Sequence, residues 1–347
     1  MSTILQQRLG IELPIIQAPM AGSQGSAMAI AVSNAGGLGS LPCAMLTPDA
    51  IRRELAAITA QTAKPVNVNF FCHLQPPPTP EREAAWRSTL APYYREFGID
   101  ADNIPAGPGR APFGAEAAAI LEEFKPAVVS FHFGLPPADL LARVKAMGSK
   151  VLASATTLDE ALWLEARGVD AIIAQGAEAG GHRGIFLSEE VTTQVGTMAL
   201  VPQIVARVKI PVIAAGGIAD AKGIAAAMRL GAAGVQIGTA FLLCTEATTS
   251  AVHRAALKSD AARHTALTNV FTGRPARGIV NRIMREVGPL NPLAPPFPLA
   301  ASAIAPLRAK AESAGSGDFS PLWSGQNATG CKEVSAAQLT RELAREP

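Results

Sequence analysis

Two glycine-bearing segments, PVIAAGG at Pro211–Gly217 and GVQIGT at Gly234–Thr239, decide how this 347-residue sequence is interpreted. Each is a short apolar run that ends at residues with little or no side chain. Such an end exposes backbone N–H groups, and these bind a phosphate well where a helix begins next. The last two strands of a (β/α)8 barrel form this kind of phosphate site. The pair therefore predicts a barrel that binds a phosphorylated cofactor.

Short apolar segments alternate with helical patterns along most of the chain. Their apolar and β-branched residues are typical of strands that are covered on both faces. Alternation of strand and helix favours a parallel sheet. The pattern predicts eight strands, at Pro14–Ala18, Gly37–Leu41, Pro65–Phe70, Ala127–Phe131, Lys150–Ala155, Ala171–Gln175, Val212–Ala215 and Gly234–Ile237. We therefore predict an α/β fold, a (β/α)8 TIM barrel with its cofactor at the carboxyl end of the strands.

Two regions interrupt the alternation of strand and helix. Residues 73–114 are rich in Pro and Gly and are too long for an ordinary connection. Residues from about 245 onward have helical and then Pro-rich character. We predict a barrel over 1–244 with an insertion at 73–114, a C-terminal helical and lid region at 245–330, and a peripheral tail at 331–347. Both additions could cover the carboxyl end of the barrel.

The composition excludes several classes of protein. Hydrophobic residues make up 48% of the chain and charged residues 17%, which favours a compact globular protein. The net charge is +2 and no dense basic stripe occurs, so a nucleic-acid partner is not expected. The uncharged stretch Leu13–Pro48 contains too many Pro and Gly residues for a membrane span. With no export signal and four widely spaced cysteines, we predict a soluble cytoplasmic protein, a monomer or homodimer.

Familiar motifs for metal catalysis and nicotinamide binding are missing from the sequence. It contains no HExxH, no GxxxxGK[ST], and no GxGxxG between a strand and a helix. We therefore expect no catalytic metal and no Rossmann domain.

Several residues at predicted strand ends are candidates for cofactor contact. Ala18, Pro19 and Met20 follow the first strand, where a planar ligand could lie against the backbone or where the chain simply turns. Asn69 and Gln175 end two other strands, and their amides can both donate to and accept from the edge of a heteroaromatic ring. Either amide could instead bond to loop backbone.

Two histidines at strand ends are the candidates for catalysis and substrate contact. The segment Gly176–Gly184 follows the sixth strand and is expected to be a flexible glycine loop that carries His182. Imidazole can act as a base or as a charged partner near neutral pH. His132 follows the fourth strand and either lines the substrate pocket or bonds to a loop carbonyl. Arg274 and Arg277, in a Gly-flanked turn, could bind an anion, anchor a lid or lie in solvent.

Taken together, these segments resemble the nitronate monooxygenase family, formerly called 2-nitropropane dioxygenases. The matching pieces are PIIQAPMAG at 14–22, AVSNAGGLGSLP at 31–42, NVNFF at 67–71, VSFHFGLP at 129–136, AQGAEAGGHRG at 174–184, PVIAAGGIAD at 211–220, GVQIGTAFL at 234–242, FTGRPARGIVNR at 271–282 and PLWSGQ at 321–326. The resemblance therefore spans most of the chain. Gly-Gly with Gln-Ile-Gly-Thr alone would also fit other FMN barrels, including those similar to inosine monophosphate dehydrogenase.

The resemblance implies an FMN-binding barrel that oxidises alkyl nitronates, such as propionate 3-nitronate, with molecular oxygen to a carbonyl product and nitrite. It places His182 at the family's catalytic histidine, and His132, from its position at a strand end, stays our candidate for substrate contact. The residues that it implies for FMN are Ala18, Pro19, Met20, Asn69, Gln175, Gly180, Gly217, Gln236, Ile237, Gly238 and Thr239.

Two alternatives and one departure accompany this interpretation. The same barrel could carry an FMN- and NAD(P)H-dependent enoyl thioester or quinone reductase, or a flavin-binding module without turnover. The sequence Ala18–Met20 and the segment around His132 favour the oxygenase. Ser23 and Ser26 stand where family members usually have a glycine and a proline, so the turn beside the cofactor differs here.

Overall fold

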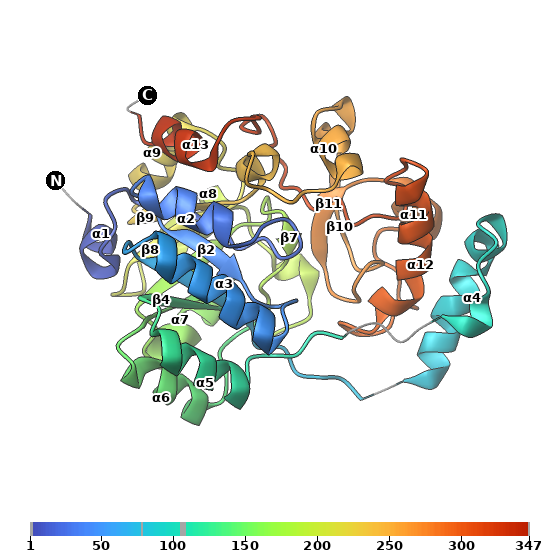
Figure 1. The fold of residues 1–347 in the computed structure, drawn as a ribbon, viewed down its shortest axis with the longest axis horizontal. Coiled ribbons are helices and arrows are strands. Elements are labelled where there is room, and N and C mark those ends of the chain that lie inside the picture. The colour runs from blue at the N-terminus through green and yellow to red at the C-terminus, as the bar shows by residue number, and fades with distance from the viewer. Residues whose placement is uncertain (1–2, 78, 105–108, 346–347) are drawn as a thin grey trace.

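The computed structural model describes residues 3–77, 79–104 and 109–345 as a parallel barrel with additions on one side (Figure 1). The eight barrel strands are β1 (Ile15–Gln17), β2 (Gly39–Pro42), β3 (Val66–Phe71), β4 (Val128–His132), β5 (Lys150–Ala155), β6 (Ala171–Gln175), β8 (Val212–Ala215) and β9 (Gly234–Ile237). Every pairing in this sheet is parallel, in the order β1-β9-β8-β6-β5-β4-β3-β2. A bridge between Ile16 and Leu38 joins the two ends of the sheet. The predicted (β/α)8 fold is confirmed, with each strand within two residues of its predicted bounds.

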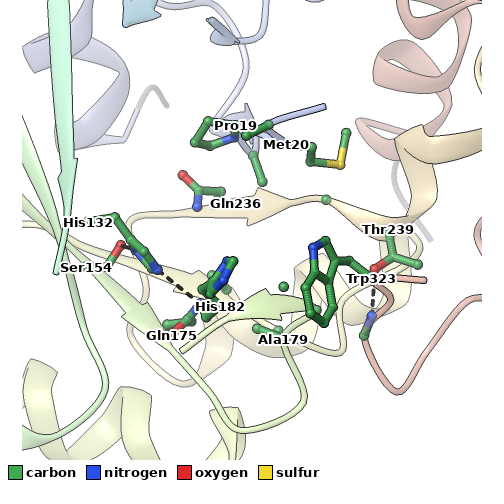
Figure 2. Close-up of a pocket in the computed structure, with 18 of the residues that line it drawn as sticks. Pro19, Met20, His132, Ser154, Gln175, Ala179, His182, Gln236, Thr239 and Trp323 are labelled. Carbon is green, nitrogen blue, oxygen red and sulfur yellow. Dashed lines mark hydrogen bonds between the residues drawn. The ribbon is translucent and has the colours of Figure 1, made fainter. Parts of the chain in front are cut away.

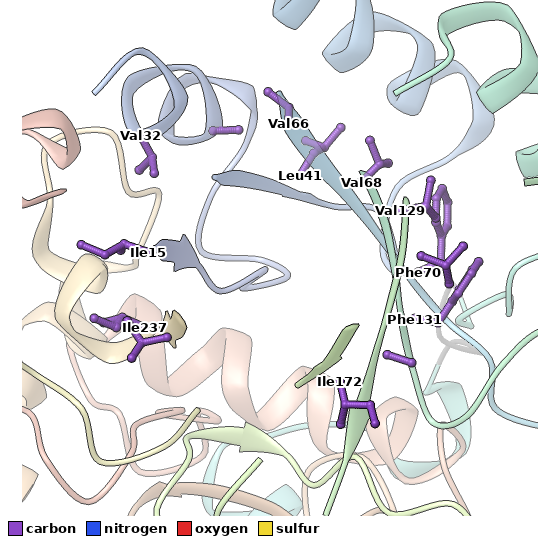
Figure 3. Close-up of a cluster of buried hydrophobic side chains, with 14 of the residues drawn as sticks. Ile15, Val32, Leu41, Val66, Val68, Phe70, Val129, Phe131, Ile172 and Ile237 are labelled. Carbon is purple, nitrogen blue, oxygen red and sulfur yellow. The ribbon is translucent and has the colours of Figure 1, made fainter. Parts of the chain in front are cut away.

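Helices cover the outside of the strands and bury their apolar faces against them. Figure 3 shows part of this core, in which Ile15, Leu41, Val68 and Phe131 project from the strands. Short polar side chains cap the helices where the strand–helix connections require it; Thr47 accepts from the amide of Ala50, for example. The helices that follow barrel strands are α2 (Ser26–Asn34), α3 (Pro48–Gln61), α5 (Ala115–Phe124), α6 (Ala138–Ala146), α7 (Leu158–Ala166), α8 (Thr197–Val205) and α9 (Ala221–Arg229). Before the barrel lies α1 (Ile4–Leu9), and short 3-10 turns occur at η1 (Ala101–Asn103), η2 (Val191–Thr193), η3 (Thr239–Leu243) and η4 (Asp260–Arg263).

A second, antiparallel sheet lies beside the barrel and was not predicted. Its order is β10 (Thr265–Thr268), β11 (Ala276–Ile279) and β7 (Gly181–His182). The expectation of a helical region from about 245 is therefore wrong for residues 265–279, which pair as strands between the helices α10 (Ala251–Leu257) and α11 (Arg282–Val287). The sheet joins the C-terminal region to the segment after β6, because β7 pairs with β11.

The insertion and the C-terminal region share a second hydrophobic core. The insertion forms α4 (Pro80–Glu96), which contacts α12 (Ala300–Ser313) beside the barrel (Figure 1). Trp86, Tyr94 and Phe319 are buried in this core. The helix α12 lies within the region predicted as helical and lid-forming, and it continues through Pro306. The division of the chain into 1–244, 245–330 and 331–347 stays a prediction.

The last helix packs against the barrel. In α13 (Ala336–Leu343), one face with Leu339 and Leu343 is buried against α2 and α9. The predicted tail therefore contains a packed helix. Among the described residues, no helix has the length and apolar character needed to cross a membrane.

Candidate functional site

A cavity lies at the carboxyl end of the barrel strands, between the barrel and the two additions (Figure 2). Twelve of the thirteen candidate residues from the sequence line it, and only Ile237 does not. Ile237 has a side chain in the barrel core, while its carbonyl accepts from the amide of Ala18. The lining residues predicted from the sequence are Ala18, Pro19, Met20, Asn69, His132, Gln175, Gly180, His182, Gly217, Gln236, Gly238 and Thr239.

Bare backbone forms one wall of this cavity, at the ends of β8 and β9. Gly216 and Gly217 have positive φ angles of 114° and 72°, which a residue with a side chain would adopt only under strain. The amides of Gly217, Gly238 and Thr239 donate to no acceptor in the described part of the chain. Thr239 also begins the 3-10 turn η3. Free amides at a chain turn suit an anion, so this wall fits a phosphate group.

Side-chain amides beside this wall leave polar atoms for a ligand. The Oε1 atom of Gln236 is buried and has no hydrogen-bond partner among the described residues. An orphaned buried acceptor costs about 1–3 kcal/mol unless a ligand or water donates to it. Asn69 donates through Nδ2 to the carbonyl and hydroxyl of Ser130. Pro19 and Met20 face the cavity from above Gln236 in Figure 2, so the space between them suits a planar group.

His182 lies on a strand and not on the flexible loop that the sequence predicted. β7 pairs Gly181 with Arg277 and His182 with Ala276. The carbonyl of His182 accepts from Gln175 Nε2 at 3.0 Å and lies 3.1 Å from His132 Nε2. These contacts fix the backbone of the candidate catalytic residue.

The imidazole of His182 is held in its neutral form. Aromatic rings surround it: Phe297 and Trp323 have centroids 5.3 and 5.5 Å away. Burial lowers the pKa of His182 well below 6.5, and the positive charges of Arg110 and Arg274 lower it further. Arg183, which the sequence places next to it, instead points away and donates to the carbonyls of the β6 end.

The hydroxyl of Thr272 selects one tautomer of this imidazole. Thr272 Oγ1 lies 2.9 Å from His182 Nε2 and 3.5 Å from the carbonyl oxygen of Arg274. We assign the hydroxyl hydrogen to that carbonyl, which only accepts, so that the oxygen accepts from Nε2–H. His182 Nδ1 has no partner in the described chain, and its lone pair is left for a ligand.

His132 lines the cavity and also holds the backbone of β7. Its Nε2 must carry the hydrogen, because the atom opposite is the carbonyl oxygen of His182. Its Nδ1 therefore accepts from the hydroxyl of Ser154, at 3.0 Å. Burial lowers the pKa of His132 to about 3, so the ring stays neutral. Both nitrogens are used within the protein, and only the ring face and edge are open to a substrate.

Gln175 also has both polar atoms engaged. Its Nε2 donates to His182 and its Oε1 accepts from the amide of Gly184 at 2.7 Å. The bonds hold the segment after β6 in place, and contact of Gln175 with a cofactor stays a prediction.

Arg274 and Arg277 bond to backbone and do not lie in solvent. Arg277 is buried and donates to the carbonyls of Ala177 and Thr265. Arg274 stacks on Phe133, with its guanidinium carbon 4.0 Å from the ring centroid, and donates to the carbonyl of Ile185. Both residues anchor the turn before β11, so the turn holds Thr272 against His182.

Comparisons with known proteins identify the family of this chain. The family model for nitronate monooxygenase matches residues 2–346. The chain is 45% identical to a nitronate monooxygenase of Pseudomonas aeruginosa, over 97% of each protein. It is 44% identical to one of Paraburkholderia phytofirmans, over 97% of this chain and 93% of that protein. The chain belongs to the nitronate monooxygenase family.

Solved structures with this fold include members of more than one enzyme group. Nitroalkane oxidase from Streptomyces ansochromogenes matches with a TM-score of 0.89 and 38% identity, over 99% of this chain and 97% of that one. FabK from Thermotoga maritima matches with a TM-score of 0.73 and 29% identity, over 100% and 96% of the two chains. The chain is thus an enzyme of the nitronate monooxygenase family on a shared barrel.

Several residues in the cavity of this nitronate monooxygenase relative were not predicted from the sequence. Trp323, Gly325 and Asn327 come from the C-terminal segment, and Gly325 donates to Thr239 Oγ1 at 2.9 Å. Arg110 comes from the insertion. The motif PLWSGQ marked this segment but gave no role, since nothing in the sequence places it against the strand ends.

Proposed function

We propose that the protein oxidises alkyl nitronates, such as propionate 3-nitronate, with molecular oxygen to a carbonyl product and nitrite, with FMN as cofactor. One observation carries the proposal: a cradle of free backbone amides and a neutral imidazole line the same cavity. Membership of the nitronate monooxygenase family supports the substrate class. The likeness to a nitroalkane oxidase supports it as well.

The residues of the bare wall fit FMN. The amides of Gly217, Gly238 and Thr239 would bind its phosphate, as free amides at helix starts do. Gln236 Oε1 is an acceptor that an N–H of the ring would satisfy. Asn69, Pro19 and Met20 would lie beside the ring. Bound FMN would supply the redox chemistry that no amino-acid side chain provides.

His182 is the residue that acts on the substrate in this proposal. As a neutral imidazole with a free Nδ1, it can accept the α-proton of a neutral nitroalkane. With a nitronate, which has already lost that proton, no base is needed and the ring only orients the substrate. The aromatic rings of Phe297 and Trp323 keep bulk water from the imidazole.

Three measurements on the purified protein test this function. The absorption spectrum should show a bound flavin, propionate 3-nitronate should cause oxygen uptake, and nitrite should form at a matching rate. A protein that is colourless and stays colourless with added FMN would refute the cofactor assignment. A yellow protein that neither consumes oxygen nor forms nitrite would refute the reaction.

The two alternative functions have their own signatures. An FMN- and NAD(P)H-dependent reductase would bleach its flavin rapidly when mixed with NADPH without oxygen. A flavin-binding module would show no turnover that depends on His182, so His182→Ala would keep FMN and change no rate. The proposed oxygenase should show slow bleaching by NADPH and, with a neutral nitroalkane as substrate, a large loss of rate in His182→Ala.

A further inference from the structure

The cavity has an unbalanced charge. Of the described residues that line it, Arg110 is the only one with a formal charge, and none is an Asp or Glu. The two histidines of the wall, His132 and His182, are neutral because burial lowers their pKa values. The space beside the bare wall therefore carries one net positive charge, supplied by the insertion.

The guanidinium of Arg110 has no partner in the described chain. It lies over the ring of Phe297, with its carbon 5.3 Å from the ring centroid, and no carboxylate or carbonyl of residues 3–77, 79–104 and 109–345 accepts from it. Its backbone is nevertheless fixed, since its carbonyl lies 3.0 Å from His73 Nε2 and 2.6 Å from Gln75 Nε2. Burial lowers the pKa of Arg110 to about 10, so it is still charged near neutral pH.

The other buried arginines near the site differ from Arg110 in this respect. Arg183 donates to two carbonyls and to Gln194, and Arg277 donates to Ala177 and Thr265. Arg274 donates to Ile185, keeps one buried Nε without a partner among the described residues, and does not line the cavity. Arg110 is half-buried and its free donors stay accessible, so an anion that enters the cavity can bind to them. Arg110 is thus the one charged group in the described cavity wall that a ligand can reach and pair with.

Arg110 is also close to the imidazole. The Phe297 ring lies 5.3 Å from the guanidinium carbon and 5.3 Å from the His182 ring centroid, so it contacts both groups. We propose that Arg110 is a substrate-binding residue that pairs with an anionic group of the substrate, a planar nitronate or carboxylate. This inference rests on the proposed function for the identity of the substrate. In this arrangement Arg110 supplies the positive charge that pairs with the substrate anion, and His182 stays neutral beside the reacting carbon.

A guanidinium suits this role because its fork of N–H donors matches the two oxygens of a nitronate or carboxylate. Butanoate is a stable probe that has the single negative charge and a similar shape to a simple alkyl nitronate. Butanamide is its neutral counterpart. Calorimetric titration of the FMN-loaded protein should show that butanoate binds more tightly than butanamide. In Arg110→Met, which keeps the stem against Phe297, butanoate affinity should fall about 10- to 100-fold, as expected for lost bonds to a charged group.

Two further variants sharpen the test. Arg110→Lys keeps the charge without the fork and should have an intermediate affinity. Arg53→Met removes one positive charge from an exposed position on α3 and should bind butanoate like the wild type. The inference is overturned if Arg110→Met, with unchanged FMN content and melting temperature, binds butanoate as the wild type does. It is also overturned if Arg53→Met weakens binding equally.

Kinetics then identify which anionic group Arg110 binds, and they separate this inference from the proposed function. If the nitronate itself binds to Arg110, KM in Arg110→Met rises for ethyl nitronate and propionate 3-nitronate alike. If a remote carboxylate binds there, KM rises for propionate 3-nitronate alone. A wild-type protein that binds butanoate through Arg110 but forms no nitrite refutes the proposed function and leaves this inference standing.

Discussion

The two walls of the cavity are made of different atoms. The backbone wall consists of Ala18–Met20, Gly216–Gly217, Gln236 and Gly238–Thr239, at the ends of β1, β8 and β9. The side-chain wall consists of His182, Arg110 and Trp323, which line the cavity, with Thr272 and Phe297 packed behind them. The backbone wall comes from the barrel alone, whereas the side-chain wall depends on the insertion and the C-terminal region.

Because of this difference, substitutions on the two walls should affect different properties of the enzyme. On the backbone wall, amides bind and side chains obstruct, so an added methyl group should affect cofactor binding most. On the side-chain wall, charged and polar side-chain atoms face the substrate, so removal of a group should affect turnover most. Cofactor affinity and rate should therefore respond to different substitutions.

The largest effect is expected from His182→Ala, on the side-chain wall. If Nδ1 of the neutral imidazole accepts the α-proton, kcat with a neutral nitroalkane should fall about 10²- to 10⁴-fold. FMN content should stay at the wild-type level, because no cofactor contact is removed. Nitrite formation and flavin absorbance measure the two quantities on one sample. His264→Gln, an exposed histidine, is the matched control and should change neither. Loss of flavin from His182→Ala would show that cofactor binding also depends on the side-chain wall.

Gly238→Val, on the backbone wall, should weaken FMN binding instead. A Cβ at this position would lie 3.3 Å from Cβ of Ala18 and would crowd the amides beside it. FMN affinity should fall about 100-fold or more, because overpacking costs about 1–3 kcal/mol and lost hydrogen bonds add to this. Equilibrium titration with FMN, followed by flavin fluorescence, measures the change.

The control for this substitution is Gly114→Val. Gly114 is also a glycine outside the left-handed region, and an added Cβ would come no closer than 3.8 Å to the nearest atom. It should bind FMN as the wild type does. If Gly238→Val retains wild-type affinity, the amides at the ends of β8 and β9 do not hold the phosphate.

A smaller effect is expected from Thr272→Val, which removes one hydroxyl and keeps the shape. Without its Nε2 partner, the imidazole of His182 would occupy both tautomers and turn more freely. We expect kcat with a neutral nitroalkane to fall about 2- to 10-fold, since one hydrogen bond contributes about 0.5–1.5 kcal/mol. Thr272→Ser should restore the rate, and FMN affinity should not change in either variant. Equal rates in wild type and Thr272→Val would exclude a role in selecting the tautomer.

The barrel could be predicted because each strand has both faces buried. Burial of this kind leaves a short apolar run in the sequence, such as Ala171–Gln175, and the next helix leaves its own pattern. The second sheet left no such pattern. β7 has only two residues, and its partner β11 lies about ninety residues away in the chain, so nothing local indicates the pairing. The bounds of the helix through Pro306 were not predicted, because its burial against α4 outweighs the local effect of the proline.

The candidate site likewise has a part that the sequence predicts and a part that it does not. Glycines at strand ends indicated the backbone wall, and a histidine after a strand indicated His182. Thr272, Trp323 and Arg110 could not be predicted, because contacts between distant segments bring Thr272 against His182 and the other two to the cavity. The sequence also predicted a flexible loop around His182, since Gly180 and Gly181 favour one. In the structure Gly180 leaves space for the C-terminal segment, where an added Cβ would lie 2.5 Å from the amide of Gly325.

The smallest expected effect concerns the stability of the side-chain wall in acid. His253, on α10, has Nε2 3.1 Å from the carbonyl of Trp323 and so holds the segment that carries this ring. Burial lowers the pKa of His253 to about 4, and Arg308 also lowers it. In the unfolded chain its pKa is about 6.5. Between these values the unfolded state binds the extra proton, so the native state loses stability as the pH falls.

The free energy of unfolding should therefore decrease by about 1 kcal/mol per pH unit on account of His253 between pH 6 and pH 4.5. Urea denaturation of the wild type and His253→Gln at each pH measures the contribution as a difference in slope. Gln keeps a donor for the Trp323 carbonyl but cannot titrate, so its slope should be shallower. His264→Gln should match the wild type. Equal slopes in wild type and His253→Gln would mean that this histidine takes up its proton without disturbing the side-chain wall. The acid sensitivity of the wall would then have to come from His182 and its neighbours.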